Sequence, residues 1–210
     1  MVKIISKNFF TEELIDKLLI SERSTITIGS DFSTETCDKS WLQTNKAWVD
    51  AIEIARIYLD LIEDTFDCDR SKLDDIWIKR NIDKWDIDDH ESTHRENADI
   101  HKDFFQDYSK VINLQVYASK DIPPEAGTCF WQYTGDNVSR DTVNGEGRIA
   151  KWPYINWKLL KQIPFEYNLA FIYNAGPDGV WHSAPITEML LDAEVPSHSR
   201  EVIICRFRYK

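Results

Sequence analysis

Apolar residues in the first third of the chain recur at steps of three and four positions, which is the spacing of a helical face. One short helix is expected after Thr11, whose side chain can cap its first turn, with Glu12 and Glu13 at the positive end of the helix dipole. A longer helix is predicted over residues 44–66. Its apolar positions are Trp48, Ala51, Ile52, Ala55, Leu59, Ile62 and Phe66. The pattern predicts a helical support over about residues 1–75.

From Ile76 onward the apolar runs shorten and are separated by turn residues, which is typical of β-strands. The clearest runs are "IWIKRNI", "KVINLQVYAS", "GTCFWQY", "YNLAFIYN" and "REVIICRFRY". Between them, "SRDTVNGEGRIAKW" indicates a polar loop and "NWKLLKQIP" a short helical excursion. Because no Pro-, Gly- and Ser-rich linker divides the chain, we predict one α+β domain over residues 1–210. Its core, about residues 76–210, is expected to be an antiparallel β-barrel or jelly roll.

The charge balance limits the possible partners. The chain of 210 residues has 25 basic and 36 acidic residues and a net charge of -11, which argues against broad binding to nucleic acid or to anionic membranes. Its four cysteines are scattered without C-x-x-C spacing, so reduced thiols are expected. We find neither a signal-peptide pattern nor a run of about 18 apolar residues, and therefore expect a soluble cytoplasmic protein.

The pentapeptide HESTH matches the zinc-peptidase pattern H-E-x-x-H, in which two histidines on one helix face bind zinc and the glutamate activates a water. Its flanks, "WDIDDHESTHRENAD", offer no apolar stripe with which such a helix could pack on a core. The longer metzincin pattern continues with a glycine and a histidine, where this chain has Asn97 and Ile100. A zinc peptidase using His90, Glu91 and His94 is therefore the least favoured hypothesis.

A second metal pattern is spread along the chain. His101 and Asp103 form an H-x-D pair, which carries little information alone. His182 follows a predicted strand and turn, and Arg200 begins the last predicted strand. Two imidazoles and one carboxylate make the facial triad that leaves three positions of Fe(II) open. We therefore predict a non-haem iron site at His101, Asp103 and His182.

The order H-x-D, His and Arg on a β-rich half resembles the 2-oxoglutarate and Fe(II)-dependent oxygenases over roughly residues 76–208. "VYASKD" is similar to the Y-L-N-K-D strand of prolyl-hydroxylase-like members, "EAGTCFW" to their G-G-T-x-F strand, and "WHSAP" to the H-x-x-x-P stretch. The resemblance implies a double-stranded β-helix, Fe(II) and 2-oxoglutarate as cofactors, and hydroxylation of a substrate coupled to decarboxylation of 2-oxoglutarate.

The resemblance also implies residue roles. His101, Asp103 and His182 would bind iron, and Arg200 would hold the distal carboxylate of 2-oxoglutarate, since a guanidinium can make two charge-assisted bonds to one carboxylate. Tyr117, at the tyrosine of the Y-L-N strand, is expected to donate a hydrogen bond to the same carboxylate.

Two further residues are candidate cosubstrate contacts. Asn113 shares one face of a strand with Gln115 and Tyr117 by the period of two, which indicates a polar pocket. Arg206 shares a strand face with Arg200, a spacing similar to the R-x-N-x-T-x-R of nucleic-acid dealkylating relatives. Val202 and Ile204 stand where that motif has Asn and Thr, so with the acidic charge a dealkylase is disfavoured.

The substrate is expected to be a small molecule or a protein side chain, and the oligomeric state is left open. The presence of Asp103 disfavours halogenation, and the loops over residues 135–164 and 187–199 are expected to set selectivity. His90 and His94 are candidate substrate contacts. Trp131, Trp152, Trp157 and Trp181 are candidates for lining the cavity. The main alternative function is a cupin-type metal-binding barrel, which would keep the three ligands without needing Arg200.

Overall fold

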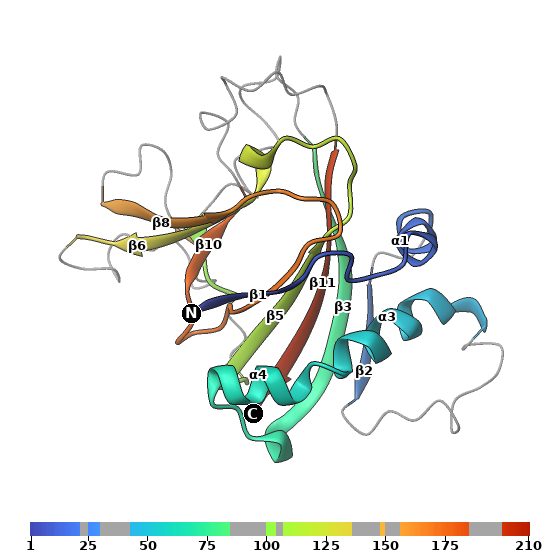
Figure 1. Ribbon diagram of the computed structural model, residues 1–210. Coiled ribbons are helices and arrows are strands. Elements are labelled where there is room, and N and C mark those ends of the chain that lie inside the picture. The colour runs from blue at the N-terminus through green and yellow to red at the C-terminus, as the bar shows by residue number, and fades with distance from the viewer. Residues whose placement is uncertain are drawn as a thin grey trace.

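Two antiparallel sheets form the centre of the computed structural model, and helices cover the outer side of one of them (Figure 1). The structure describes residues 1–21, 25–29, 43–84, 100–103, 107–135, 148–149, 156–184 and 199–210. The major sheet has six strands in the order β1-β9-β5-β11-β3-β2, and the minor sheet has five in the order β7-β4-β10-β6-β8. This arrangement is consistent with the predicted α+β class.

The elements have the following bounds. The major sheet consists of β1 (Val2–Ser6), β9 (Ala170–Asn174), β5 (Lys110–Tyr117), β11 (Ser199–Tyr209), β3 (Leu73–Lys84) and β2 (Thr25–Gly29). The minor sheet consists of β7 (Arg148–Ile149), β4 (Ile100–His101), β10 (Trp181–Ser183), β6 (Thr128–Tyr133) and β8 (Trp157–Ile163). The helices among the described residues are α1 (Glu12–Leu19), α3 (Lys46–Arg56), α4 (Leu59–Phe66) and two 3-10 turns, Arg70–Lys72 and Pro124–Ala126.

Strand β5 separates two interiors, as the alternation of its residues predicts. Ile112, Leu114 and Val116 are fully buried in the cluster that also contains the helices. Tyr117 belongs to the cluster between the two sheets, and Asn113 bonds with residues of that same interior. The helix side of the major sheet is therefore a dry core, while its other side carries polar groups toward the minor sheet.

The helices are held by their apolar faces. Leu18 of α1 and Ile52 of α3 are fully buried against the major sheet, whose outer side these helices cover (Figure 1). Burying one such aliphatic side chain stabilises the folded state by about 1.5–3 kcal/mol. These contacts fix the position of β5 and β11, which carry the candidate site residues.

The first third of the chain is less helical than predicted. β1 and β2 form the two edges of the major sheet, so this part contributes strands as well as helices. β2 has the alternating burial of a strand, with Ile26 and Ile28 inside. The predicted helix over residues 44–66 is divided, because Ile57 and Tyr58 donate backbone bonds to residues three positions earlier and the helix ends there.

The segment "NWKLLKQIP", predicted as a short helical excursion, forms the edge strand β8 instead. Its backbone hydrogen bonds are made with β6, and Leu159 and Leu160 are both exposed. An edge strand with both faces exposed lacks the alternation by which a strand is recognised, which explains the wrong prediction.

Thr11 caps α1 as predicted: the Leu14 N–H donates to its Oγ1 at 3.2 Å. Replacing Thr11 with alanine is expected to lower the free energy of unfolding by about 1 kcal/mol, because the first turn loses this acceptor. Urea denaturation of the metal-free protein would measure the loss. Thr11→Ser keeps the hydroxyl and should remain near the wild-type value; equal losses in both variants would contradict a capping role.

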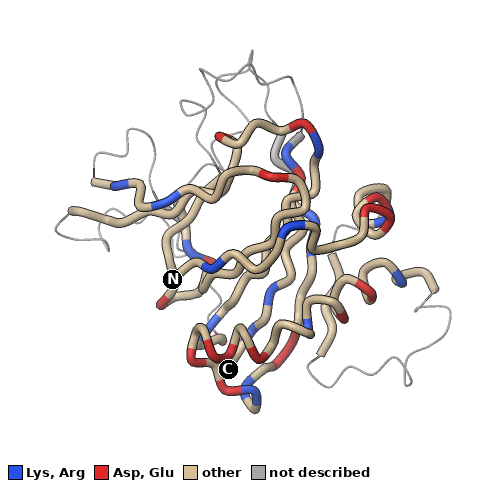
Figure 2. The backbone as a smooth tube through the Cα atoms, viewed as in Figure 1, with Lys and Arg blue, Asp and Glu red and all other residues tan. Residues whose placement is uncertain are grey.

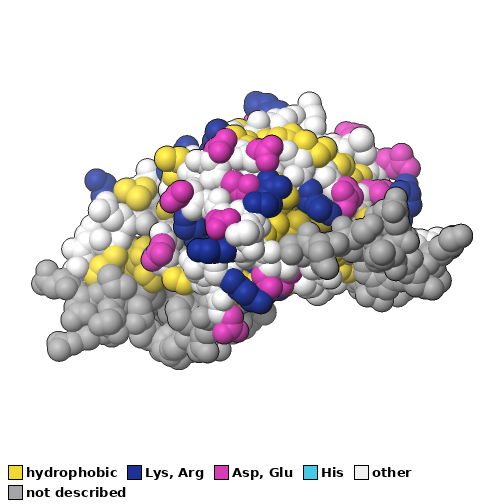
Figure 3. All heavy atoms as spheres, turned by 90° about the horizontal axis from the view of Figure 1, so that it is seen from below, with side chains coloured by type: hydrophobic (Ala, Val, Ile, Leu, Met, Phe, Trp, Pro, Cys, Tyr) yellow, Lys and Arg dark blue, Asp and Glu magenta, His cyan; other side chains and the backbone are white. Residues whose placement is uncertain are grey.

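Charges of both signs are distributed over the described surface. Asp and Glu positions, red on the backbone tube of Figure 2, recur along α1, α3 and α4. On the face seen in Figure 3, Lys and Arg side chains lie among Asp and Glu side chains. No helix within the described residues is long and apolar enough to cross a membrane.

Candidate metal centre

The pairing of β4 with β10 brings the three predicted iron ligands together. His101 lies directly opposite His182 in this antiparallel pair, and their ring centres are 4.4 Å apart. Asp103 follows β4, and its N–H donates to the Ala175 carbonyl oxygen at 2.7 Å, which ties it to the end of β9. One ligand atom from each of the three residues lies within 4.8 Å of the others. The geometry suits one metal ion, and occupancy by iron stays a prediction.

The His182 ring is oriented for metal binding through Nε2. Its Nδ1 lies 3.2 Å from the Val180 carbonyl oxygen, so the hydrogen bond places the proton on Nδ1 and leaves the Nε2 lone pair free. Nε2 lies 3.8 Å from Asp103 Oδ2. Burial, together with the nearby His101, lowers the pKa of His182 to about 3. The ring is therefore neutral near pH 7, which is the form that binds a metal ion.

Asp103 is held as a carboxylate by two donors. Its Oδ2 accepts hydrogen bonds from the Arg206 guanidinium at 2.5 Å and from Asn113 Nδ2 at 2.9 Å. Burial alone would raise the pKa of Asp103, but Arg206, then His182 and His101, lower it below its ordinary value. Among the described residues no hydrogen bond reaches Oδ1. The same Oδ2 lies 3.8 Å from His182 Nε2, so these two donors fix the carboxylate oxygen that faces the candidate metal ligand.

Arg206 and Asn113 belong to one row of directly paired residues that crosses four strands of the major sheet. In the register, Trp77, Arg206, Asn113 and Tyr173 are consecutive partners on β3, β11, β5 and β9. Arg206 Nε donates to Asn113 Oδ1 at 2.8 Å, and the guanidinium lies 4.8 Å from the centre of the Trp77 ring. Both residues were predicted as cosubstrate contacts. In the structure they hold Asp103, so their contact with a cosubstrate stays untested.

Arg200 is buried in the same interior, with 3% of its surface exposed. Its Nε donates to the Ala126 carbonyl oxygen at 2.8 Å, and an NH2 group donates to Thr128 Oγ1 at 2.9 Å. The guanidinium lies 5.7 Å and 5.8 Å from the ring centres of Tyr117 and Phe165. A buried cation is thus fixed at the start of β11, at the predicted carboxylate-binding position.

The Tyr117 hydroxyl is hydrogen-bonded within the protein, and its predicted contact with a cosubstrate stays untested. The O–H donates to the Ile163 carbonyl oxygen at 2.8 Å, and the oxygen accepts from the Thr128 N–H at 2.8 Å. Because a phenol has one proton to donate, the predicted donation from Tyr117 to a cosubstrate carboxylate would require this bond to Ile163 to break. In the structure Tyr117 contacts Arg200 through its ring.

Sequence reasoning assigned no role to Tyr173, although its ring contacts that of His182. Its ring is edge-on to the His182 ring with 5.0 Å between centres. Its hydroxyl accepts from Asn113 Nδ2 at 3.1 Å and donates to Gln115 Oε1 at 3.1 Å. Alternation in "NLAFIYN" places Tyr173 and Phe171 on one face, and this was the available signal.

The tryptophans do not line the space between the sheets where the structure describes them. Trp181 precedes His182 on β10 and therefore points to the opposite side of the minor sheet. Trp131 is its partner on β6, and Trp157 is packed against the same separate cluster. Trp152 lies outside the described residues. The same is true of His90, Glu91 and His94, so the zinc-peptidase pattern is untested.

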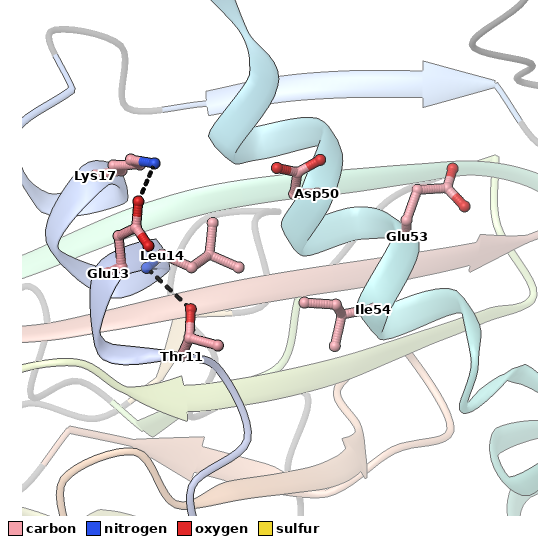
Figure 4. Close-up of a pocket in the computed structure, with 7 residues that line it drawn as sticks. All are labelled: Thr11, Glu13, Leu14, Lys17, Asp50, Glu53 and Ile54. Carbon is pink, nitrogen blue, oxygen red and sulfur yellow. Dashed lines mark hydrogen bonds and ion pairs between the residues drawn. The ribbon is translucent and has the colours of Figure 1, made fainter.

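A surface groove between α1 and α3 is distinct from the metal centre (Figure 4). Its acidic side chains are paired: Glu13 bonds with Lys17 at 2.6 Å, and Asp50 bonds with Lys46 at 2.9 Å. These pairs belong to single helices and are exposed, so each contributes little to stability.

Comparison with known proteins found no protein-family model and no curated protein that matches the chain. Among solved structures, a prolyl-4-hydroxylase from Pseudomonas putida is similar, with a TM-score of 0.46 and 9% identity over 100% of this chain and 92% of the other. HygX from Streptomyces hygroscopicus with iron bound has a TM-score of 0.44 and 12% identity over 100% of this chain and 82% of HygX. HygX with nickel and 2-oxoglutarate bound has a TM-score of 0.37 and 12% identity, over 93% and 86%. At these TM-scores and identities, the similarities fix no activity, ligand or residue role for this chain.

Proposed function

We propose that the chain is a 2-oxoglutarate- and Fe(II)-dependent dioxygenase of the hydroxylase type, built on a double-stranded β-helix. The observation that carries the proposal is the convergence of His101, Asp103 and His182 between the two sheets. Two imidazoles and one carboxylate are a donor set that suits Fe(II) and leaves positions open. With Fe(II) and 2-oxoglutarate bound, the site would supply oxygen activation coupled to release of succinate and carbon dioxide.

The remaining residues have positioning roles in this proposal. Arg206 and Asn113 orient the Asp103 carboxylate and keep it ionised. Arg200 binds the distal carboxylate of 2-oxoglutarate and orients the cosubstrate. Phe130 and Phe171, which are buried between the sheets, help to exclude water from the reaction. The substrate is proposed to be a small molecule or a protein side chain.

One observation favours a second candidate, a cupin-type metal-binding barrel without 2-oxoglutarate. Two donor groups of Arg200 are already used by Ala126 and Thr128, so its position also has a structural explanation. Such a protein would keep the three metal ligands but would show no dependence on Arg200 for ligand binding.

Succinate formation separates the two candidates. Wild-type protein should convert 2-oxoglutarate to succinate only with Fe(II) and oxygen. Amino acids, peptides and nucleosides are screened as substrates that stimulate this conversion. Arg200→Lys keeps the charge but loses the planar fork. It is expected to raise the half-saturating 2-oxoglutarate concentration about 10- to 100-fold, since a hydrogen bond to a charged group contributes about 1.5–3 kcal/mol.

Arg208→Lys is a matched control, because Arg208 lies on β11 but pairs with Asp75. It should leave the half-saturating concentration unchanged. An Arg200→Lys variant that saturates like the wild type would remove Arg200 from the cosubstrate site and favour the cupin-type barrel.

A further inference from the structure

A continuous chain of buried hydrogen bonds joins the metal centre to Arg200. Its links, from the Asp103 end, are Asp103–Asn113 at 2.9 Å, Asn113–Tyr173 at 3.1 Å, Tyr173–Gln115 at 3.1 Å, Gln115–Thr128 at 2.8 Å and Thr128–Arg200 at 2.9 Å. The four intermediate residues are at most 3% exposed. The chain crosses from β9 and β5 of the major sheet to β6 of the minor sheet. It therefore connects the two ends of the proposed active site through the interior.

The direction of each hydrogen bond is fixed by the charged groups at the ends. Ionised Asp103 can only accept, so the Asn113 amide donates to it and also donates to the Tyr173 hydroxyl. The Tyr173 proton then goes to Gln115 Oε1. The Gln115 amide donates to Thr128 Oγ1, which also accepts from Arg200. The three bonds from Asn113 through Tyr173 and Gln115 to Thr128 run in one direction, and bonds aligned in this way polarise and strengthen one another in a buried setting.

We propose that Tyr173, Gln115 and Thr128 form a positioning relay that couples metal binding at the triad to carboxylate binding at Arg200. This inference rests on the proposed function. A metal ion would fix Asp103 and, through Asn113, the Tyr173 hydroxyl. The relay would then hold Gln115 and Thr128 in the orientation that presents Arg200 to a carboxylate. By thermodynamic reciprocity, a carboxylate at Arg200 must strengthen metal binding by the same factor.

Tyr173 is the link at which the relay can be interrupted with least disturbance. Its hydroxyl joins the Asn113 half to the Gln115 half, while its ring packs edge-on against Phe130 with 5.1 Å between centres. Tyr173→Phe removes the hydroxyl and keeps the ring. Gln115→Met interrupts the next link and provides a second variant if the first does not fold.

The test measures the dissociation constant of Zn(II) with and without saturating butyrate. Butyrate carries the distal carboxylate of 2-oxoglutarate but has no second group with which to bind the metal. In the wild type, butyrate is expected to tighten Zn(II) binding about 5-fold or more, the lower end of typical coupling between sites. In Tyr173→Phe and in Gln115→Met, the ratio of the Zn(II) dissociation constant without butyrate to that with butyrate should fall to about one, while Zn(II) still binds.

Tyr167→Phe is the matched control, since it removes a hydroxyl that lies outside the relay, and it should keep the wild-type ratio. A wild-type ratio of one, or an unchanged ratio in Tyr173→Phe, would overturn the relay even if succinate formation is normal. Wild-type protein that binds neither Zn(II) nor 2-oxoglutarate would overturn the relay and the proposed function together.

Discussion

Replacing Asp103 with alanine is expected to weaken Fe(II) binding more than about 100-fold and to abolish succinate formation. Removal of groups that only support a metal ligand already costs about 10- to 100-fold in affinity, and here the ligand itself is lost. The change also leaves His101 and His182 without the anion that offsets the charge of the metal. Competition with a coloured chelator under anaerobic conditions would measure the affinity.

Asp107→Ala is the control for this experiment, because Asp107 lies on the same connection but is exposed. It should bind Fe(II) like the wild type. Circular dichroism would confirm that Asp103→Ala remains folded despite the unpaired Arg206. If Fe(II) affinity in Asp103→Ala stays within a few-fold of the wild type, Asp103 is not a ligand and the triad is wrong.

Replacing Arg206 with methionine is expected to cost about 3–5 kcal/mol in the free energy of unfolding. The Asp103 and Arg206 side chains are 15% and 4% exposed, so the variant leaves a nearly buried carboxylate without its cation. Methionine fills much of the same volume beside Trp77, which keeps the loss of packing small. Urea denaturation of the metal-free protein at neutral pH would measure the difference.

A double variant distinguishes the charge effect from packing. When Asp103→Asn is combined with Arg206→Met, no unpaired charge remains, so the double variant should be more stable than Arg206→Met alone. Exposed ion pairs contribute less than about 1 kcal/mol. If Arg206→Met lowers the free energy of unfolding by no more than this, Asp103 is not a buried carboxylate held by Arg206.

The three candidate metal ligands could be predicted because their residue types and order along the chain carry the signal. His101 and His182 are far apart in sequence and lie on the short strands β4 and β10, which were not among the predicted strands, so residue type and order identified them and apolar alternation did not. The polar face of β5 could be predicted from alternation, since a period of two assigns Asn113, Gln115 and Tyr117 to one side.

The partners of these residues could not be predicted, because they follow from the register between strands. The pattern of β11 places Arg206 on the same face as Arg200, but six residues of a strand span about 20 Å, so the two serve different ends of the interior. The contact of Arg206 with Asn113, and of Asn113 with Tyr173, depends on how β11, β5 and β9 are aligned. No single strand carries that information.

The errors in secondary structure have a related cause. β1, β2 and β8 are edge strands whose backbone pairing comes from a distant segment. β8 has exposed residues on both faces, so its pattern predicts a helix rather than a strand. β1 and β2 lie in a region whose other segments are helical. Local periodicity therefore predicted the longer inner strands, but it missed the edges and the short inner strands β4 and β10.

We propose that His101, Asp103 and His182 bind Fe(II) in a form that 2-oxoglutarate can chelate. The most direct test is to add Fe(II) and then 2-oxoglutarate to the wild-type protein without oxygen and to record the visible absorption spectrum. We expect a charge-transfer band that requires both additions, is absent from His182→Ala and Asp103→Ala, and persists in Asp107→Ala. Its absence from the folded wild-type protein, or its persistence in both triad variants, would contradict the account.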